Sequence, residues 1–261
     1  MEIIGYIIVL SFIFETMDSS AGMGFGTGLT PLLFILGFDP LQVVPILLIS
    51  EAITGITAGF FHHEFGNVKF SIHRPLNKET KIMIVIAGIG CISILISVLL
   101  TYLAIGFSKN IIKTYVAILV LVMGLIGMLR LKQKQYLFKP KLLACFSALA
   151  GFNKGIGAGG YGPVVMMGQV FSGIYEKTAT AIVSLAEGIV CIVGVATFLF
   201  ISNYGVTIDY VLLPSIVTGG FIASLVSPYL VRVIPNTFWR VLIPSYAICM
   251  GIVMMTQLYL L

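Results

Sequence analysis

The chain has 261 residues, of which 59% are hydrophobic and only 10% are charged. A soluble domain carries about 25% charged residues because its surface must be wet, so this composition excludes a soluble globule. The hydrophobic runs lack the sustained alternation of a membrane β-barrel. We therefore predict an all-α, multi-pass integral protein of the cell membrane, with the lipid bilayer as a partner. The net charge of +5 comes from short loops beside apolar runs, so it predicts no nucleic-acid partner.

In chain order, the sequence begins with an apolar segment, 3–37, that is interrupted by a glycine-rich break, and a similar segment follows the midpoint at 141–172. The other apolar stretches are uninterrupted and long enough to cross about 30 Å of hydrocarbon. They lie at 41–61, 82–107, 111–129, 178–201, 210–231 and 238–261.

The two halves of the chain resemble one another in the same order. AGMGFGTGLTP (21–31) pairs with KGIGAGGYGP (154–163), and SEAITG pairs with AEGIVC, which aligns Glu51 with Glu187. GCISILIS pairs with GFIASLVS, and KNIIK pairs with PNTFWR. Such an internal duplication is typical of transporter folds. We predict a first membrane repeat over 1–130, a basic cytoplasmic connection over 131–140 and a second membrane repeat over 141–261.

The lysines and arginines favour one topology of these repeats. If each broken segment crosses the membrane once, the basic loop residues divide nine against five between the two sides. If each is a re-entrant hairpin, they divide twelve against two, which the positive-inside rule prefers. Each half then has a pair of glycine-broken half-helices plus three membrane-spanning helices. The halves are inverted relative to one another, and both termini face outward.

The glycine breaks allow two interpretations. One is close helix packing through GxxxG pairs, Gly22/Gly26 and Gly155/Gly159. The other is that the helix stops, because glycines at this density cost helix stability that packing alone seldom requires. Exposed backbone at membrane depth is tolerated only where it lines a cavity.

If the helix stops, half-helices begin after Gly28 and after Gly162, with Pro31 and Pro163 close to their first turns. Their N-terminal amides attract anions, so two such ends near the midplane predict one anion site. The candidate substrate-binding residues are Gly22, Gly24, Gly26, Thr27, Asn153, Lys154, Gly155, Gly157, Gly159 and Gly160.

Lys154 precedes the second break, away from either membrane surface. A buried cation is costly, so we expect it to attract an anionic substrate. The alternatives are that it snorkels to the interface or pairs with an internal acid. Only the second break supplies a cation, because the first reads SSAGMG where the second reads FNKGIG.

Four acids lie inside apolar segments and are candidates for proton coupling: Glu15, Asp18, Glu51 and Glu187. A buried carboxyl group can exist in its neutral form and take up protons during transport. Two alternatives stay open. The protonated acids hydrogen-bond neighbouring helices without a further role, or they bind a cation and reverse the substrate charge.

The remaining polar motifs predict no further chemistry. HHEF at 62–65 lacks the ligand spacing of zinc sites, so with His73 it is interpreted as part of a polar cytoplasmic loop. The sequence contains no HExxH motif, no serine–histidine pair at membrane depth and no ATP-binding domain. The sequence thus predicts that the protein is not an enzyme and has neither a metal site nor a cofactor. It also predicts that any transport is driven by gradients.

The duplicated breaks resemble the sulfite exporter TauE/SafE family of membrane transporters. The resemblance is carried by GMGFGTGLTP with its following helix through Glu51, and by GIGAGGYGP with its following helix through Glu187. The segment GGFIASLVSPYLVRVIPNTFWRVLIPSYAICMGIVMM also resembles the C-terminal helix pair of that family.

The resemblance implies secondary transport of sulfur-containing anions such as sulfite, thiosulfate or organosulfonates. We expect the anion to bind near the midplane between the breaks, with protons as a candidate coupling ion. The alternative is a cation or metal transporter that uses Glu15, Asp18, Glu51 and Glu187. The GxxxG-like faces leave a homodimer open.

Overall fold

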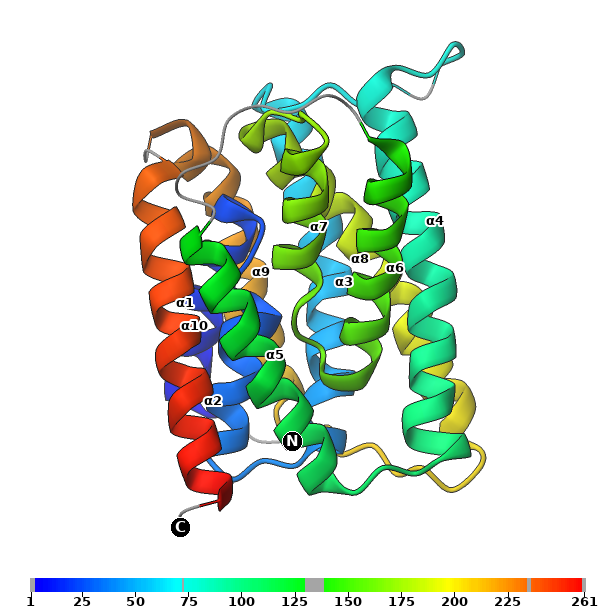
Figure 1. Cartoon of the computed structure of the whole chain (residues 1–261), viewed down its shortest axis with the longest axis vertical. Coiled ribbons are helices and arrows are strands. Elements are labelled where there is room, and N and C mark those ends of the chain that lie inside the picture. Colours follow the sequence, from blue (N-terminus) through cyan, green and yellow to red (C-terminus); the bar gives the residue numbers. More distant parts are fainter. Residues whose placement is uncertain (1–2, 72, 130–138, 234–235, 260–261) are drawn as a thin grey trace.

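The computed structural model describes residues 3–71, 73–129, 139–233 and 236–259, and these fold into a bundle of helices without a strand (Figure 1). The elements in chain order are α1 (Gly5–Ala21), the π-helical η1 (Phe25–Leu29), α2 (Thr30–Ile35), α3 (Pro40–Glu64), α4 (Lys78–Val98), the π-helical η2 (Leu99–Ala104), α5 (Lys109–Leu129), α6 (Pro140–Gly157), α7 (Tyr161–Phe171), α8 (Glu176–Ser202), α9 (Leu213–Val233) and α10 (Asn236–Tyr259). The predicted all-α fold is confirmed.

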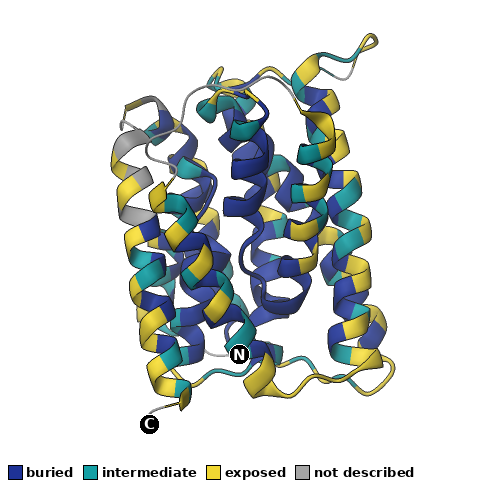
Figure 2. Ribbon diagram, in the orientation of Figure 1, coloured by how far each residue is buried: buried dark blue, intermediate teal, exposed yellow. Residues whose placement is uncertain are grey.

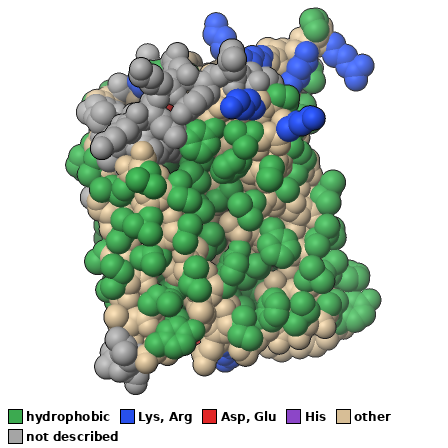
Figure 3. All heavy atoms as spheres, in the orientation of Figure 1, with side chains coloured by type: hydrophobic (Ala, Val, Ile, Leu, Met, Phe, Trp, Pro, Cys, Tyr) green, Lys and Arg blue, Asp and Glu red, His purple; other side chains and the backbone are tan. Residues whose placement is uncertain are grey.

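Within the described ranges, five helices are long and apolar enough to cross a membrane: α3, α4 with η2, α5, α8 and α9. They are helical because backbone N–H and C=O groups have no water to bind in hydrocarbon and must pair within the segment. α10 occupies the sixth predicted range. Apolar side chains cover the face of the bundle in Figure 3, as a lipid-facing surface requires. The protein is a multi-pass membrane protein.

Each glycine break reverses the chain and forms a helical hairpin. The first hairpin, α1 with η1–α2, starts and finishes at one end of the bundle, where Ile4 N–H donates to Ser215 Oγ and Gln257 Nε2 donates to the Ile35 carbonyl. The second hairpin, α6 with α7, starts and finishes at the opposite end, where Ser172 Oγ donates to the Lys139 carbonyl. Figure 1 shows both termini at the first of these ends, which we call the termini end.

The centre of the bundle is formed by α3, α8 and the two hairpins, as the burial pattern in Figure 2 shows. The apolar windows of α3 and α8 are 67% and 61% buried, against 44% and 39% for α4 and α5, which therefore lie at the periphery. α3 and α8 cross closely because Gly55 and Gly188 have no side chains. A Cβ on Gly55 would lie 2.8 Å from the Gly188 backbone nitrogen.

The tips of the two hairpins meet inside the bundle. A Cβ added to Gly26 of η1 would lie 2.0 Å from the carbonyl oxygen of Ala158, and one added to Gly162 would lie 2.5 Å from the carbonyl oxygen of Gly22. Because these neighbours are backbone atoms, the close approach requires glycine at positions 26 and 162. The breaks thus serve close packing as well as chain reversal.

Two details differ from the expectations of the sequence. α2 begins at Thr30 with Pro31 in its first turn, close to the predicted start after Gly28, but a π-helical turn from Phe25 precedes it. α7 begins at Tyr161, before the predicted start after Gly162, because the left-handed Gly160 that permits reversal comes first. Pro163 still lies within the first turn of α7, where a missing N–H costs nothing. Most of the predicted basic connection, 131–138, lies outside the described residues.

Candidate functional site

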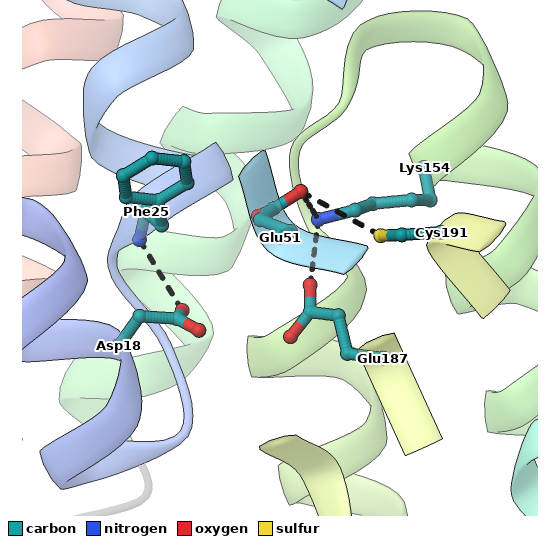
Figure 4. A network of polar contacts seen from close by, with 6 residues as sticks. All are labelled: Asp18, Phe25, Glu51, Lys154, Glu187 and Cys191. Atoms are coloured by element: carbon teal, nitrogen blue, oxygen red, sulfur yellow. Dashed lines mark hydrogen bonds and ion pairs between the residues drawn. The ribbon is translucent and has the colours of Figure 1, made fainter. Parts of the chain in front are cut away.

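Lys154 projects from the last turn of α6 into the centre of the bundle (Figure 4). Its side chain is 1% exposed, and its Nζ lies 2.5 Å from Glu51 Oε2 and 2.6 Å from Glu187 Oε1. Glu51 comes from the middle of α3 and Glu187 from the middle of α8. The lysine therefore joins the second hairpin to both central helices, and in this conformation it is paired with internal acids.

A narrow cavity of about 10 Å³ lies beside this ion-pair cluster. A space of this size has room for roughly one water molecule. Its lining residues are carboxyl, hydroxyl and glycine residues of α1, α3 and α8: Glu15, Asp18, Ser19, Glu51, Thr54, Gly55, Ser184 and Glu187. The fold thus brings together all four acids that the sequence singled out for proton coupling.

Several oxygen atoms of this lining have no hydrogen-bond partner among the described residues. They are Glu15 Oε2, Glu51 Oε1, Thr54 Oγ1 and Glu187 Oε2. Buried polar atoms in proteins are nearly always hydrogen-bonded, so four such atoms around one space indicate that protons, water or a ligand belong there. Four carboxyl groups share this interior with the single ammonium group of Lys154, so the cluster is acidic overall when all are ionised.

The first hairpin binds its own acids. Ser19 Oγ donates to Glu15 Oε1 at 2.6 Å, one helical turn away. The backbone N–H of Phe25, at the start of η1, donates to Asp18 Oδ1 at 3.2 Å, as Figure 4 shows. The amide that the first break exposes is therefore taken up by a carboxylate of the protein, which reduces the attraction of this break for an external anion.

The second break carries two buried polar groups without a partner among the described residues. α7 begins after Gly160 without a capping side chain among the described residues. Nearby, Asn153 Oδ1 accepts a hydrogen bond from the Tyr115 hydroxyl, while Asn153 Nδ2 and the Tyr161 hydroxyl have no partner in the part of the chain described. An uncapped helix N-terminus carries partial positive charge. With this N-terminus and two unpartnered side-chain groups, the second break has more polar groups available to a ligand than the first.

The other predicted binding residues are buried within the hairpins and do not line the acidic cavity. Gly155 packs against Ser97, and Gly157 packs against Val116. The remaining positions are at the chain reversals or the contact between hairpin tips: Gly22, Gly24, Gly26, Thr27, Gly159 and Gly160. Lys154 is the link between the glycine breaks and the acids.

Sequence reasoning missed the hydroxyl and thiol groups around the acids. Ser19, Thr54 and Ser184 line the cavity, and Cys191 Sγ donates to Glu51 Oε2 at 3.7 Å. A signal was present, since each hydroxyl residue lies three or four positions from an acid on the same helix and therefore on the same face. The thiol of Cys191 reaches Glu51 only through the crossing of α3 and α8.

The interpretation of HHEF as a cytoplasmic loop was wrong for His62. His62 and His63 lie in the last turn of α3, and His62 is fully buried. His62 Nε2 donates to the Ser19 carbonyl at 3.0 Å, and Asn67 Nδ2 donates to His62 Nδ1 at 3.0 Å. These two hydrogen bonds link the end of α3 to the first hairpin and to the loop that follows α3, and they satisfy both nitrogen atoms of the buried imidazole.

Broken helices that enclose charged groups deep in a helical membrane bundle are the arrangement of secondary transporters. The sequence profile described as "Sulfite exporter TauE/SafE" matches residues 7–254, and the chain belongs to this family of membrane transporters. The resemblance noted from the sequence is thereby confirmed. The chain is also similar to the "Probable membrane transporter protein YtnM" of Bacillus subtilis (strain 168), with 26% identity covering 93% of this chain and 80% of that protein.

Proposed function

We propose that this protein is a secondary transporter of small sulfur-containing anions, such as sulfite, thiosulfate or an organosulfonate. The observation that carries the proposal is Lys154, a fully buried cation beside the meeting point of two helix breaks. Apolar side chains of similar volume would stabilise the fold at least as well as a buried ion pair. Stability alone therefore does not explain a buried lysine at this position. The anion binds near the midplane between the breaks, with Lys154 and the free donors of the second break as its ligands.

The binding residues of this proposal are those predicted from the two breaks, and Glu15, Asp18, Glu51 and Glu187 are its proton-coupling groups. The four unpartnered oxygens around the cavity support a role in proton binding, because each is a free acceptor. They equally suit a bound cation, which is the alternative function. Against a metal substrate, no group of three or more His, Cys, Asp or Glu side chains within the described ranges has the arrangement of metal ligands.

Uptake into proteoliposomes tests the function. We expect saturable uptake of radiolabelled sulfite or thiosulfate and none of sodium or manganese ions. Lys141→Gln, which removes an exposed lysine from the same helix as Lys154, should leave uptake unchanged. Cation uptake without anion uptake, in folded protein, would favour the alternative function.

We also propose that the chain is two inverted repeats, 1–130 and 141–261. Exchanging α1 with α6, α2 with α7, α3 with α8, α4 with α9 and α5 with α10 converts the most extensive helix contacts of one set into those of the other. Thus α1 packs on α9 as α6 packs on α4, and α3 packs on α9 as α8 packs on α4. The hairpins open at opposite ends of the bundle, as inversion requires.

This architecture predicts that both termini lie outside the cytoplasm. Lys69, Lys81, Lys139 and Lys141 lie near the end of α3 and the starts of α4 and α6, which are opposite the termini. Basic side chains gather at that end in Figure 3, and the positive-inside rule makes it cytoplasmic. We expect alkaline phosphatase fused to the C-terminus to be active and green fluorescent protein there to be dark. Green fluorescent protein inserted in the loop 65–77 should fluoresce. A bright C-terminal fusion would contradict the topology.

A homodimer stays a prediction. Gly22, Gly26, Gly155 and Gly159, which suggested it, are buried within the protomer and contact other parts of the same chain. A dimer would therefore form through other surfaces.

A further inference from the structure

The ammonium group of Lys154 is already occupied by two carboxylates. Glu51 Oε2 and Glu187 Oε1 lie 2.5 and 2.6 Å from Nζ, on side chains that are 3% and 5% exposed. An ammonium group has three hydrogens to donate, so two of them are engaged. An oxyanion reaches Lys154 only where these carboxylates release it or become neutral. The substrate and the carboxylates thus compete for one cation.

Charge balance decides how this competition ends. Lys154 with ionised Glu51 and Glu187 carries one net negative charge. A divalent oxyanion added to that cluster would change its net charge from −1 to −3. An uncompensated charge is strongly disfavoured deep in a bundle. If each carboxylate takes up one proton as the anion enters, the net charge of the cluster is unchanged. Two protons replace the two carboxylate charges that the dianion displaces.

The free oxygens of the two carboxyl groups can receive these protons. Glu51 Oε1 and Glu187 Oε2 have no partner among the described residues, and both residues line the small cavity. Once protonated, each carboxyl becomes a donor to a water molecule or hydroxyl group there. The ion-pair oxygens, Glu51 Oε2 and Glu187 Oε1, are then free to leave the ammonium group.

Other ionisable groups face this pair from each neighbouring element. α1 contributes Glu15 and Asp18 to the same cavity, α8 contributes Cys191 at 3.7 Å from Glu51, and α7 contributes the Tyr161 hydroxyl, which interacts electrostatically with Glu187. Cys91 of α4 interacts with Tyr161. Glu15 and Asp18 accept from Ser19 and Phe25 instead of Lys154. The exchange of protons for anion therefore involves the two glutamates that hold the lysine.

From this geometry we propose that the protein carries one divalent oxyanion together with two protons, bound by Glu51 and Glu187, in an electroneutral cycle. The inference rests on the proposed function and names its coupling ion and stoichiometry. The cargo of one dianion and two protons has no net charge, and the empty carrier returns without cargo, so a complete cycle moves no net charge across the membrane.

The test uses thiosulfate, a dianion at neutral pH, and proteoliposomes in which potassium and valinomycin set the membrane potential. In the wild type, an inward proton gradient should drive thiosulfate accumulation, and the potential should not change it. In Glu187→Gln one proton is lost, so each cycle moves one negative charge. An inside-negative potential of about 59 mV should then lower the accumulation ratio tenfold. Glu51→Gln should behave in the same way.

The matched control is Glu64→Gln, which removes an exposed acid at the end of α3 and should keep transport insensitive to the potential. Because a glutamate variant can fail to fold, proton uptake is also measured on the wild type. Thiosulfate added to weakly buffered, purified protein should remove two protons from solution per anion bound. Binding without proton uptake, or wild-type transport that follows the potential, would overturn the inference and leave the anion function intact. Absence of any binding of thiosulfate, sulfite or an organosulfonate would overturn both.

Discussion

Lys154→Met is expected to destabilise the protein severely, because it removes the cation from a buried cluster and leaves two carboxylates facing each other. Breaking a buried ion pair by deleting one partner costs about 3–5 kcal/mol, chiefly through the uncompensated charge that remains. Here Glu51 and Glu187 both lose their partner. Thermal unfolding in detergent, followed by size-exclusion chromatography, should show a much lower melting temperature or no folded peak.

A triple variant separates stability from transport. Replacing Lys154 with Met together with Glu51→Gln and Glu187→Gln leaves a neutral cluster of similar shape. It should recover most of the melting temperature, since removing both signs of charge avoids the unpaired group. It should still fail to transport. A single Lys154→Met variant as stable as the wild type would contradict the ion-pair geometry.

Gly26→Val is expected to have the second large effect, since Gly26 is where the two hairpins touch. A Cβ there would lie 2.0 Å from the Ala158 carbonyl oxygen and 3.1 Å from the Gly159 Cα. Backbone atoms cannot move aside as a flexible side chain does, so the hairpins must separate. We expect a loss beyond the roughly 1–3 kcal/mol typical of overpacking, seen as a strongly reduced yield of folded protein.

The control for this variant is Gly88→Ala in α4. Gly88 is exposed, and a Cβ there has no neighbour within 4 Å. Alanine should be neutral or should stabilise the helix by about 1 kcal/mol. If Gly26→Val expresses and melts like the wild type while Gly88→Ala does too, the hairpin tips are not in contact.

The membrane helices could be predicted because their signal is local. Apolar length fixes a spanning helix without reference to its neighbours, and α3, α5 and α8 fall within a few residues of their predicted ranges. The chain reversals were predicted in the correct glycine-rich segments, but the π-helical turn before α2 was missed and the start of α7 was placed late. A glycine run does not specify which of its members adopts the left-handed backbone, and here Gly22 and Gly160 do so.

The candidate site was predictable only in part. Buried charge in an apolar segment marked Lys154, Glu51 and Glu187 individually, and pairing with an internal acid was one alternative for the lysine. Which acids it meets depends on the crossing of α3 and α8 at Gly55 and Gly188, a tertiary feature without a local signal. His62 was misplaced for the same reason, because its partner Ser19 belongs to α1, which is distant from His62 in the sequence.

The central claim is that Lys154 binds the transported anion, and equilibrium binding of radiolabelled thiosulfate tests it most directly. Purified wild-type protein and the triple variant, Lys154→Met with Glu51→Gln and Glu187→Gln, would be compared at equal folded concentration. The account predicts saturable binding to the wild type and none to the triple variant. Equal binding by both proteins would contradict it, because the anion would then be held without the lysine.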